Sequence, residues 1–277
     1  MPFDGRDLVN AYQEYLNFIR HSSYQDHARY IFPFFEGTYF TYRKIDVLRI
    51  VTIARSISPD PRYLDIGCGY GDFLNKVIRY IPSAIGIEKD STIYYRLKRT
   101  KPEHIISLPI ECMTQPVDVA FVGWMEPGVD FRHRVAEIAK CVITTFDQGG
   151  QCGIHGGCEY EEFGYRRVAW WRTPSWIDVN HELMNRYYTQ RLTDNSVLKN
   201  SLINLRSAHN LWYVYARDEN IKNKIKPDLM NWLKRECPLS QTEKFDFEHI
   251  LEQCGFQYDI RLPSAHPSDK LWEVHFD

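Results

Sequence analysis

The sequence lacks the long apolar stretches that cross membranes. No run among its 277 residues approaches about 18 apolar positions, and the longest candidate, 45–57, is interrupted by Arg49, Thr52 and Arg55. Residues 1–7 are polar and do not form the apolar core of a signal peptide. We therefore expect a soluble, cytoplasmic protein without a membrane partner.

A disulfide framework and a strong net charge are also missing. The seven cysteines are an odd number scattered along the chain, which suits a reducing compartment. Lys and Arg number 34 against 36 Asp and Glu, so the formal net charge is −2. No strong basic field is available to hold nucleic acid, which leaves only a local patch for that role.

Aromatic residues, in contrast, are abundant, at 14% of the chain. They gather in residues 24–42 and again, interleaved with arginines, in residues 159–191. Such segments either pack on the core as a hydrophobic strap or cover a site from which water is excluded. The arginine-rich segment equally suits stacking on bases or on small aromatic molecules.

The most informative stretch begins with an apolar run, 63–66, that a single acid, Asp65, interrupts. Glycines follow at alternate positions, Gly67, Gly69 and Gly71, and apolar residues then recur at helical spacing. This pattern predicts a buried strand, a tight loop and a helix start, the arrangement that holds nucleotide-like ligands in α/β domains. Glycines allow the loop backbone to turn sharply and approach a ligand closely.

The acid in this loop indicates which ligand it holds. A carboxylate at Asp65 would repel a pyrophosphate but attracts a cation, by roughly 4 kcal/mol at about 4 Å before desolvation. A second acid, Glu88, ends the next apolar run, where it can accept hydrogen bonds from ribose hydroxyls. Glu88 alone would also suit a nicotinamide dinucleotide. Together the two motifs resemble the first two motifs of class I S-adenosylmethionine-dependent methyltransferases, on Asp65, Gly67, Gly69, Gly71 and Glu88.

The resemblance implies an α/β fold, a Rossmann-like seven-stranded and mostly parallel sheet with helices on both faces. It covers 61–146 and 245–277 as the cofactor-binding core, with an N-terminal helical and aromatic cap in 1–60. Residues 147–244, a glycine-rich loop and an inserted cap segment, interrupt it after the fifth strand. The residues that it assigns to S-adenosylmethionine are Asp65, Gly67, Cys68, Gly69, Gly71, Glu88, Glu111 and Gly123.

A second apolar strand ends in a loop at 123–127, beyond the carboxyl end of the predicted sheet where ligands bind. It resembles the fourth motif of the methyltransferases without the Asn/Asp-Pro-Pro-Tyr of enzymes that methylate amino groups, which argues against adenine as acceptor. We expect Trp124 and Pro127 to contact the acceptor, although Trp124 also suits a core position. Glu126 is a candidate general base, or a solvent-exposed turn acid.

The glycine-rich loop 147–158 follows the next strand and places mobile backbone near the same edge. Within it, His155 is a second candidate base. Cys152, His155 and Cys158 also have zinc-ligand chemistry, but no fourth ligand is adjacent. We therefore predict a substrate loop here and no metal.

The expected function is methyl transfer from S-adenosylmethionine to an unidentified acceptor, most simply a small molecule. An RNA or protein acceptor would require an open groove, basic in the case of RNA. A protein that binds the cofactor without catalysis is the third alternative.

Overall fold

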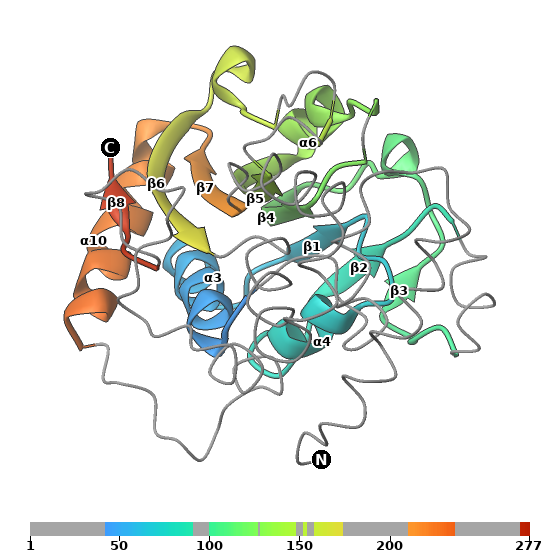
Figure 1. Cartoon of the computed structure of the whole chain (residues 1–277), viewed down its shortest axis with the longest axis horizontal. Coiled ribbons are helices and arrows are strands. Elements are labelled where there is room, and N and C mark those ends of the chain that lie inside the picture. The colour runs from blue at the N-terminus through green and yellow to red at the C-terminus, as the bar shows by residue number, and fades with distance from the viewer. Residues whose placement is uncertain are drawn as a thin grey trace, which may run out of the picture.

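The computed structural model describes residues 42–90, 100–126, 128–147, 152–153, 158–173, 210–235 and 272–277. Their strands form one eight-stranded sheet in the order β3-β2-β1-β4-β5-β7-β6-β8 (Figure 1). The strands are β1 Tyr63–Ile66, β2 Ile85–Ile87, β3 Ile105–Ile106, β4 Val117–Gly123, β5 Ala139–Asp147, β6 Arg166–Thr173, β7 Asn210–Ala216 and β8 His275–Phe276. The helices are α3 Lys44–Ile57, α4 Asp72–Ile78, α6 Arg132–Ile138 and α10 Glu219–Arg235, with 3-10 turns η2 Ile110–Cys112 and η3 Glu161–Phe163.

The first five strands are parallel, and the remaining ones pair antiparallel. The order reverses at β1, since β2 lies on one side of it and β4 on the other. Chain crossovers in opposite directions leave a crevice at the carboxyl ends of β1 and β4, where open α/β sheets bind ligands. The predicted Rossmann-like α/β class is therefore confirmed.

The sheet differs from the prediction in its second half. Strands β6 and β7 fall within 147–244, the predicted insertion, and complete the sheet next to β5. The described sheet therefore has eight strands where seven were expected. Strand β6 was not predicted because it carries arginines at 166, 167 and 172, which made the segment resemble a solvent-exposed cap. In the structure only one face of this strand is buried. The sequence pattern also predicts a terminal pair of strands at 258–262 and 271–276. Strand β8 lies within the second range, and the first range lies outside the described residues.

The apolar residues in 105–110 predict a strand over this range, but β3 is shorter and ends at Ile106. The chain leaves the sheet after Ile106 and forms the turn η2 from Ile110, with Pro109 as its preceding residue. Proline has no N–H to donate to a neighbouring strand. Of the predicted cap, residues 1–60, the structure describes the part from Tyr42 onwards, which includes α3.

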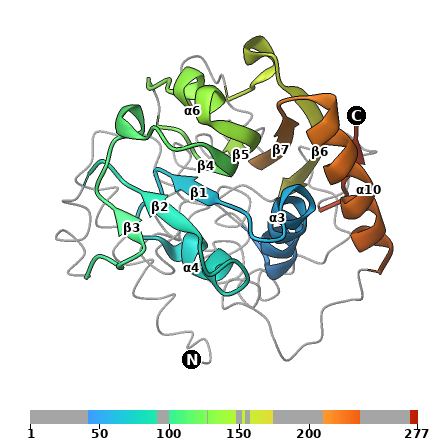
Figure 2. The same cartoon turned by 180° about the vertical axis from the view of Figure 1, so that it is seen from behind.

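Helices cover both faces of the sheet (Figure 2). On one face, α3, α4 and α10 bury a core against the odd-numbered positions of β4 and β5, with Ile50, Val77 and Leu229 fully buried. On the other face, Val135 of α6 and Val142 of β5 belong to a second buried cluster.

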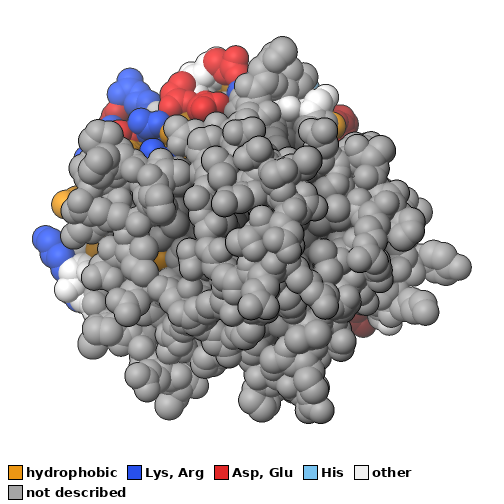
Figure 3. Space-filling view, viewed as in Figure 1, with side chains coloured by type: hydrophobic (Ala, Val, Ile, Leu, Met, Phe, Trp, Pro, Cys, Tyr) orange, Lys and Arg blue, Asp and Glu red, His pale blue; other side chains and the backbone are white. Residues whose placement is uncertain are grey.

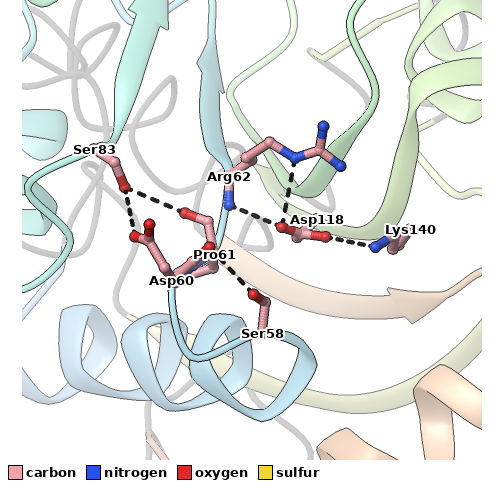
Figure 4. Close-up of polar contacts among 7 residues, drawn as sticks. All are labelled: Ser58, Asp60, Pro61, Arg62, Ser83, Asp118 and Lys140. Atoms are coloured by element: carbon pink, nitrogen blue, oxygen red, sulfur yellow. Dashed lines mark hydrogen bonds and ion pairs between the residues drawn. The ribbon is translucent and has the colours of Figure 1, made fainter.

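A polar network lies at the amino ends of the parallel strands (Figure 4). Asp118, at the start of β4, accepts a hydrogen bond from the backbone N–H of Arg62 at 2.9 Å and one from Lys140 Nζ at 2.7 Å. Burial acts to raise the pKa of Asp118, but these hydrogen bonds outweigh it, and the pKa is lowered. Beside it, Ser83 Oγ donates to Asp60 Oδ1 at 3.3 Å. This network joins the starts of β1, β4 and β5 at the edge opposite the crevice.

A buried carboxylate ties α3 to the far half of the sheet. Asp46 is fully buried and accepts hydrogen bonds from Trp171 Nε1 at 2.8 Å and Trp272 Nε1 at 3.2 Å. The backbone N–H of Arg43 donates to it at 2.8 Å, which caps the helix start. Burial raises the pKa of Asp46, and Arg49 and Arg43 oppose this effect.

The visible charged side chains form no field of one sign. Acidic and basic groups lie side by side at the upper edge of the face in Figure 3. Ion pairs in the described residues include Arg132–Glu162 at 2.6 Å and Arg166–Glu219. Among these residues, no helix has the length and apolarity needed to span a membrane.

Candidate functional site

The glycine loop after β1 folds as the sequence predicts. The N–H groups of Gly67 and Cys68 both donate to the carbonyl oxygen of Ile87, at 2.9 and 3.1 Å, so the loop is held against the end of β2. Gly67, Gly69 and Gly71 all have positive φ, between 55° and 81°. Residues with a Cβ rarely adopt this conformation, which explains the three glycines.

Glu88 is fixed at the edge of this loop. Its Oε2 accepts a hydrogen bond from the Gly69 N–H at 3.0 Å, and its Oε1 accepts one from the Asp90 N–H at 2.9 Å. A carboxylate has about four acceptor positions, so both oxygens can still accept hydrogen bonds from a ligand. The backbone N–H of Glu88 is held by Ile106 of β3. The side chain is therefore positioned before any ligand arrives.

Asp65 lies beneath the same loop and is 3% exposed. It is in register with Gly86 of β2 and Phe121 of β4. Burial, and then the charge of Glu88, raise the pKa of Asp65 to about 8. A positive charge near the loop would favour the ionised form of this carboxyl. Asp65 and Glu88 together therefore make a site that favours a cationic ligand and disfavours an anionic one.

A cavity of about 160 Å³ opens beside Glu88 at the carboxyl ends of β1, β2 and β4. Five of the predicted site residues line it, namely Gly67, Glu88, Glu111, Trp124 and Glu126. Its apolar wall comes from residues that the sequence analysis did not assign to the site, including Ile66, Leu108, Met125, Val129 and Phe131. Ile66 ends β1, and the other four lie in segments that follow β3 or β4, so their position at or after a strand end is the sequence signal for them. A flat apolar group with a polar edge facing Glu111 matches this lining.

Asp65, Cys68, Gly69, Gly71 and Gly123 are not among the residues that line this cavity. Cys68 instead packs on β2, because a Cβ built on Gly86 would lie 2.7 Å from its sulfur. Burial raises the pKa of the Cys68 thiol, which therefore stays protonated. Gly86 is a structural requirement of the site that the sequence analysis did not identify.

Trp124 follows β4 in a conformation that bulky residues rarely adopt, with φ of 57°. Its backbone N–H donates to the Thr145 carbonyl oxygen at 2.9 Å, which holds this conformation in place. The ring lines the cavity and also packs against both hydrophobic clusters. Backbone strain of this kind often occurs at ligand sites. Trp124 is thus both a cavity wall and a core residue, whereas Pro127 lies outside the described residues.

Glu126, the first candidate base, lies at the cavity and forms an ion pair with Lys89 Nζ at 3.2 Å. Both side chains are mainly exposed, at 65% and 60%. An exposed pair of this type contributes little to stability. It links the loop after β2 to the loop after β4.

The segment after β5 is joined to the loop after β4 by two backbone hydrogen bonds. The Gly153 N–H donates to the Met125 oxygen at 3.1 Å, and the Gly128 N–H donates to the Gly153 oxygen at 2.9 Å. Cys152 and Cys158 are buried free thiols. His155, the other candidate base and third member of the zinc hypothesis, lies outside the described residues. Within the described part of the chain, no three His, Cys, Asp or Glu side chains cluster as a metal site would require.

The sequence matches no protein-family model and no curated protein. Similar solved structures include a putative sarcosine dimethylglycine methyltransferase from Galdieria sulphuraria, 10% identical, covering 63% of this chain and 84% of that one with a TM-score of 0.45. The geranyl diphosphate C-methyltransferase of Streptomyces coelicolor A3(2) is 13% identical, covers 72% and 85%, and has a TM-score of 0.42. The cyclopropane synthase MmaA2 of Mycobacterium tuberculosis is 12% identical, covers 61% and 83%, and has a TM-score of 0.39. The solved structures similar to this chain thus include methyltransferases, one of them described in complex with S-adenosyl-L-homocysteine.

Proposed function

We propose that this chain binds S-adenosylmethionine and transfers its methyl group to a small-molecule acceptor. The observation that carries the proposal is the pair of acids around the glycine loop: Glu88, held by the Gly69 N–H, and Asp65, buried beneath it. A dinucleotide would bring its pyrophosphate to this loop, and that negative charge would keep Asp65 protonated, whereas a cationic ligand would favour the ionised carboxylate that attracts it. A ligand with ribose hydroxyls and a cationic amino-acid end suits both acids.

The residues of the cavity have separate roles in this proposal. Glu88 accepts hydrogen bonds from the ribose, Glu111 faces the adenine amino group, and Leu108 covers the ring. Asp65 stabilises the positive charge near the loop. When bound, S-adenosylmethionine supplies an electrophilic methyl group on a sulfonium, which is already a good leaving group. The protein is then required chiefly to align the acceptor and exclude water.

We also propose Glu126 and His155 as candidate general bases. If the acceptor has to lose a proton, Glu126 is at the cavity to accept it, although it is now paired with Lys89. An acceptor that is already nucleophilic needs neither residue. The rate of methyl transfer by Glu126→Gln, compared with the wild type across pH, distinguishes the two cases.

The proposal is tested by calorimetric titration with S-adenosylmethionine, S-adenosylhomocysteine and NAD. We expect both sulfur ligands to bind and NAD not to bind; the reverse would overturn the proposal. Glu88→Gln should weaken binding by about 1–3 kcal/mol, because a charged acceptor of hydrogen bonds is lost. Glu103→Gln, which changes an exposed acid outside the cavity, is the matched control.

The acceptor class is tested by incubating the protein and labelled S-adenosylmethionine with cell extract. We expect label in the metabolite fraction. Label in RNA or in protein would support one of the alternative acceptors, and binding without label in any fraction would support a non-catalytic protein.

A further inference from the structure

The cavity beside Glu88 is small for the ligand that the proposed function places in it. Its volume is about 160 Å³. Pockets that enclose most of a ligand of drug size measure roughly 300–1,000 Å³. Part of the lining therefore has to move when a whole nucleoside-containing molecule binds.

Much of the lining is fixed by the core. Ile66, Ile87 and Met125 are each at most 3% exposed, and all three belong to the buried cluster that also contains Val142. Ile110 of the turn η2 is buried in the same cluster. Displacing such side chains would remove contacts from a close-packed interior. These residues form the part of the cavity that resists movement.

Lys89 and Glu126 form an exposed part of the lining. Lys89 Nζ and Glu126 Oε2 are 3.2 Å apart, and both side chains are mainly exposed. Neither side chain makes another hydrogen bond or ion pair among the described residues. Water and salt screen an exposed pair of this kind, so it is broken at little cost.

The pair spans the carboxyl end of β1. Lys89 follows β2 and Glu126 lies in the loop after β4, and β1 lies between these two strands in the sheet (Figure 1). Strands are about 4.8 Å apart, so the two side chains bridge a gap of about 10 Å. Gly67, which follows β1, also lines the cavity, and a Cβ built on it would meet no atom within 4 Å. The pair therefore lies across the solvent side of the cavity, and the glycine loop contributes its open inner side.

We propose that the Lys89–Glu126 ion pair is an autoinhibitory contact, which narrows the cofactor cavity in the ligand-free protein and breaks when the cofactor enters. The inference rests on the proposed function, because it takes S-adenosylmethionine and its demethylated product as the ligands of this cavity. Since the pair has to open before the ligand fits, the observed affinity is lower than that of a cavity already open. Lys89 thus opposes cofactor binding although it lines the site.

The test measures binding of S-adenosylhomocysteine to the full chain, by calorimetry for affinity and by stopped-flow fluorescence for association rate. This ligand has no net charge near neutral pH, so a changed protein charge has little effect on its encounter rate. Lys89→Met removes the charge and keeps an unbranched side chain. We expect it to bind about 1.5- to 5-fold more tightly than the wild type, through faster association, because one exposed ion pair is removed. A lysine that contacts the cofactor would give weaker binding instead.

A double-mutant cycle assigns the effect to the pair. Glu126→Gln should tighten binding to a similar extent. Lys89→Met/Glu126→Gln should bind no more tightly than either single variant, because the same pair can be removed only once. Arg166→Met is the matched control, since it removes the exposed ion pair with Glu219, outside the cavity, and should leave the affinity unchanged.

Salt provides a second readout. At about 1 M salt the Debye length is about 3 Å, so wild-type affinity should rise toward that of Lys89→Met. Unchanged or weaker binding by Lys89→Met, additive effects in the double variant, or an equal response of both proteins to salt would overturn the autoinhibitory contact. Failure of S-adenosylhomocysteine to bind the wild type and every variant would instead contradict the proposed function itself.

Discussion

A carboxyl group with a strongly raised pKa lies under the cofactor loop. Asp65 is buried beside Glu88, and burial followed by that charge raises its pKa to about 8 from an ordinary 3.8. Between these values the folded protein holds a proton on Asp65 that the unfolded chain has released. The free energy of unfolding therefore falls as pH rises through this window, by up to about 1.4 kcal/mol per pH unit.

Asp65→Asn should abolish this slope, because the amide does not titrate. Urea unfolding of the wild type and the variant from about pH 5 to about pH 8 measures how the free energy of unfolding of each protein changes with pH. We expect the apo variant to gain stability relative to the wild type as pH rises. Parallel curves for the two proteins would contradict the raised pKa.

The same carboxyl links cofactor binding to pH. If a cationic ligand binds near Asp65, it favours the ionised carboxyl and releases a proton, so wild-type affinity for S-adenosylmethionine should rise up to about pH 8. Calorimetry in buffers of different ionisation enthalpy detects this proton directly. In Asp65→Asn the affinity should be lower and independent of pH.

At the scale of the element, the strand–loop–helix unit from β1 to α4 needs its glycines for two different reasons. Gly67 and Gly71 both have positive φ, but their surroundings differ. Gly67 faces open space in the cavity, whereas a Cβ on Gly71 would lie 2.5 Å from Ile105 Cδ1. One glycine leaves room for a ligand and the other allows the loop to pack on β3.

Alanine substitutions should separate these roles. Each costs about 1–2 kcal/mol of stability through the left-handed backbone, and Gly71→Ala costs somewhat more because Ile105 must move. Only Gly67→Ala places a methyl group at the cavity, so only this variant should also lose affinity for S-adenosylhomocysteine. Thermal unfolding and calorimetry measure both quantities; equal losses of affinity would contradict the assignment.

At the scale of the whole molecule, the carboxyl ends and the amino ends of the parallel strands have different roles. At the carboxyl ends of the strands, Asp65 and Glu88 form no ion pair with a base among the described residues, and Glu88 lines the cavity. At the amino edge, Asp118 is paired with Arg62 and Lys140 (Figure 4). Because the parallel strands share one direction, ligand binding and strand anchoring occur at opposite ends.

Asp118→Asn should therefore destabilise the protein without changing cofactor affinity. We expect a loss of about 1–3 kcal/mol at neutral pH, from weakened hydrogen bonds to a buried side chain. Since its folded pKa is lowered, this contribution is present above the ordinary pKa of 3.8 and is lost as pH falls below it. Urea unfolding and calorimetry provide the two measurements, and a lower affinity would show that the edges are coupled.

The sequence predicted the local features that depend on neighbouring residues. The glycines of the loop and the acid at the end of β2 follow from backbone conformation and from hydrophobic period. The hydrophobic period also predicts a helix at 43–56, which is observed as α3, Lys44–Ile57. The Rossmann-like class was predictable because buried parallel strands are continuous apolar runs, as in β4.

The second half of the sheet depended on long-range pairing. Strand β6 carries arginines at 166, 167 and 172, yet it is a strand because β7 pairs with it across a long stretch of chain. Polar residues on one face of a strand look like those of a solvated segment until its partner is known. The expected insertion therefore contained two strands of the sheet.

Sequence alone determined the glycine loop and the two acids beside it, since both depend on a few adjacent residues. Only the tertiary structure decided the raised pKa of Asp65, which requires burial from several elements at once. It also decided that Lys89 and Glu126, which are far apart in the chain, form an ion pair at the cavity. Electrostatics and hydrogen-bond satisfaction depend on neighbours in space, and chain order does not specify these neighbours.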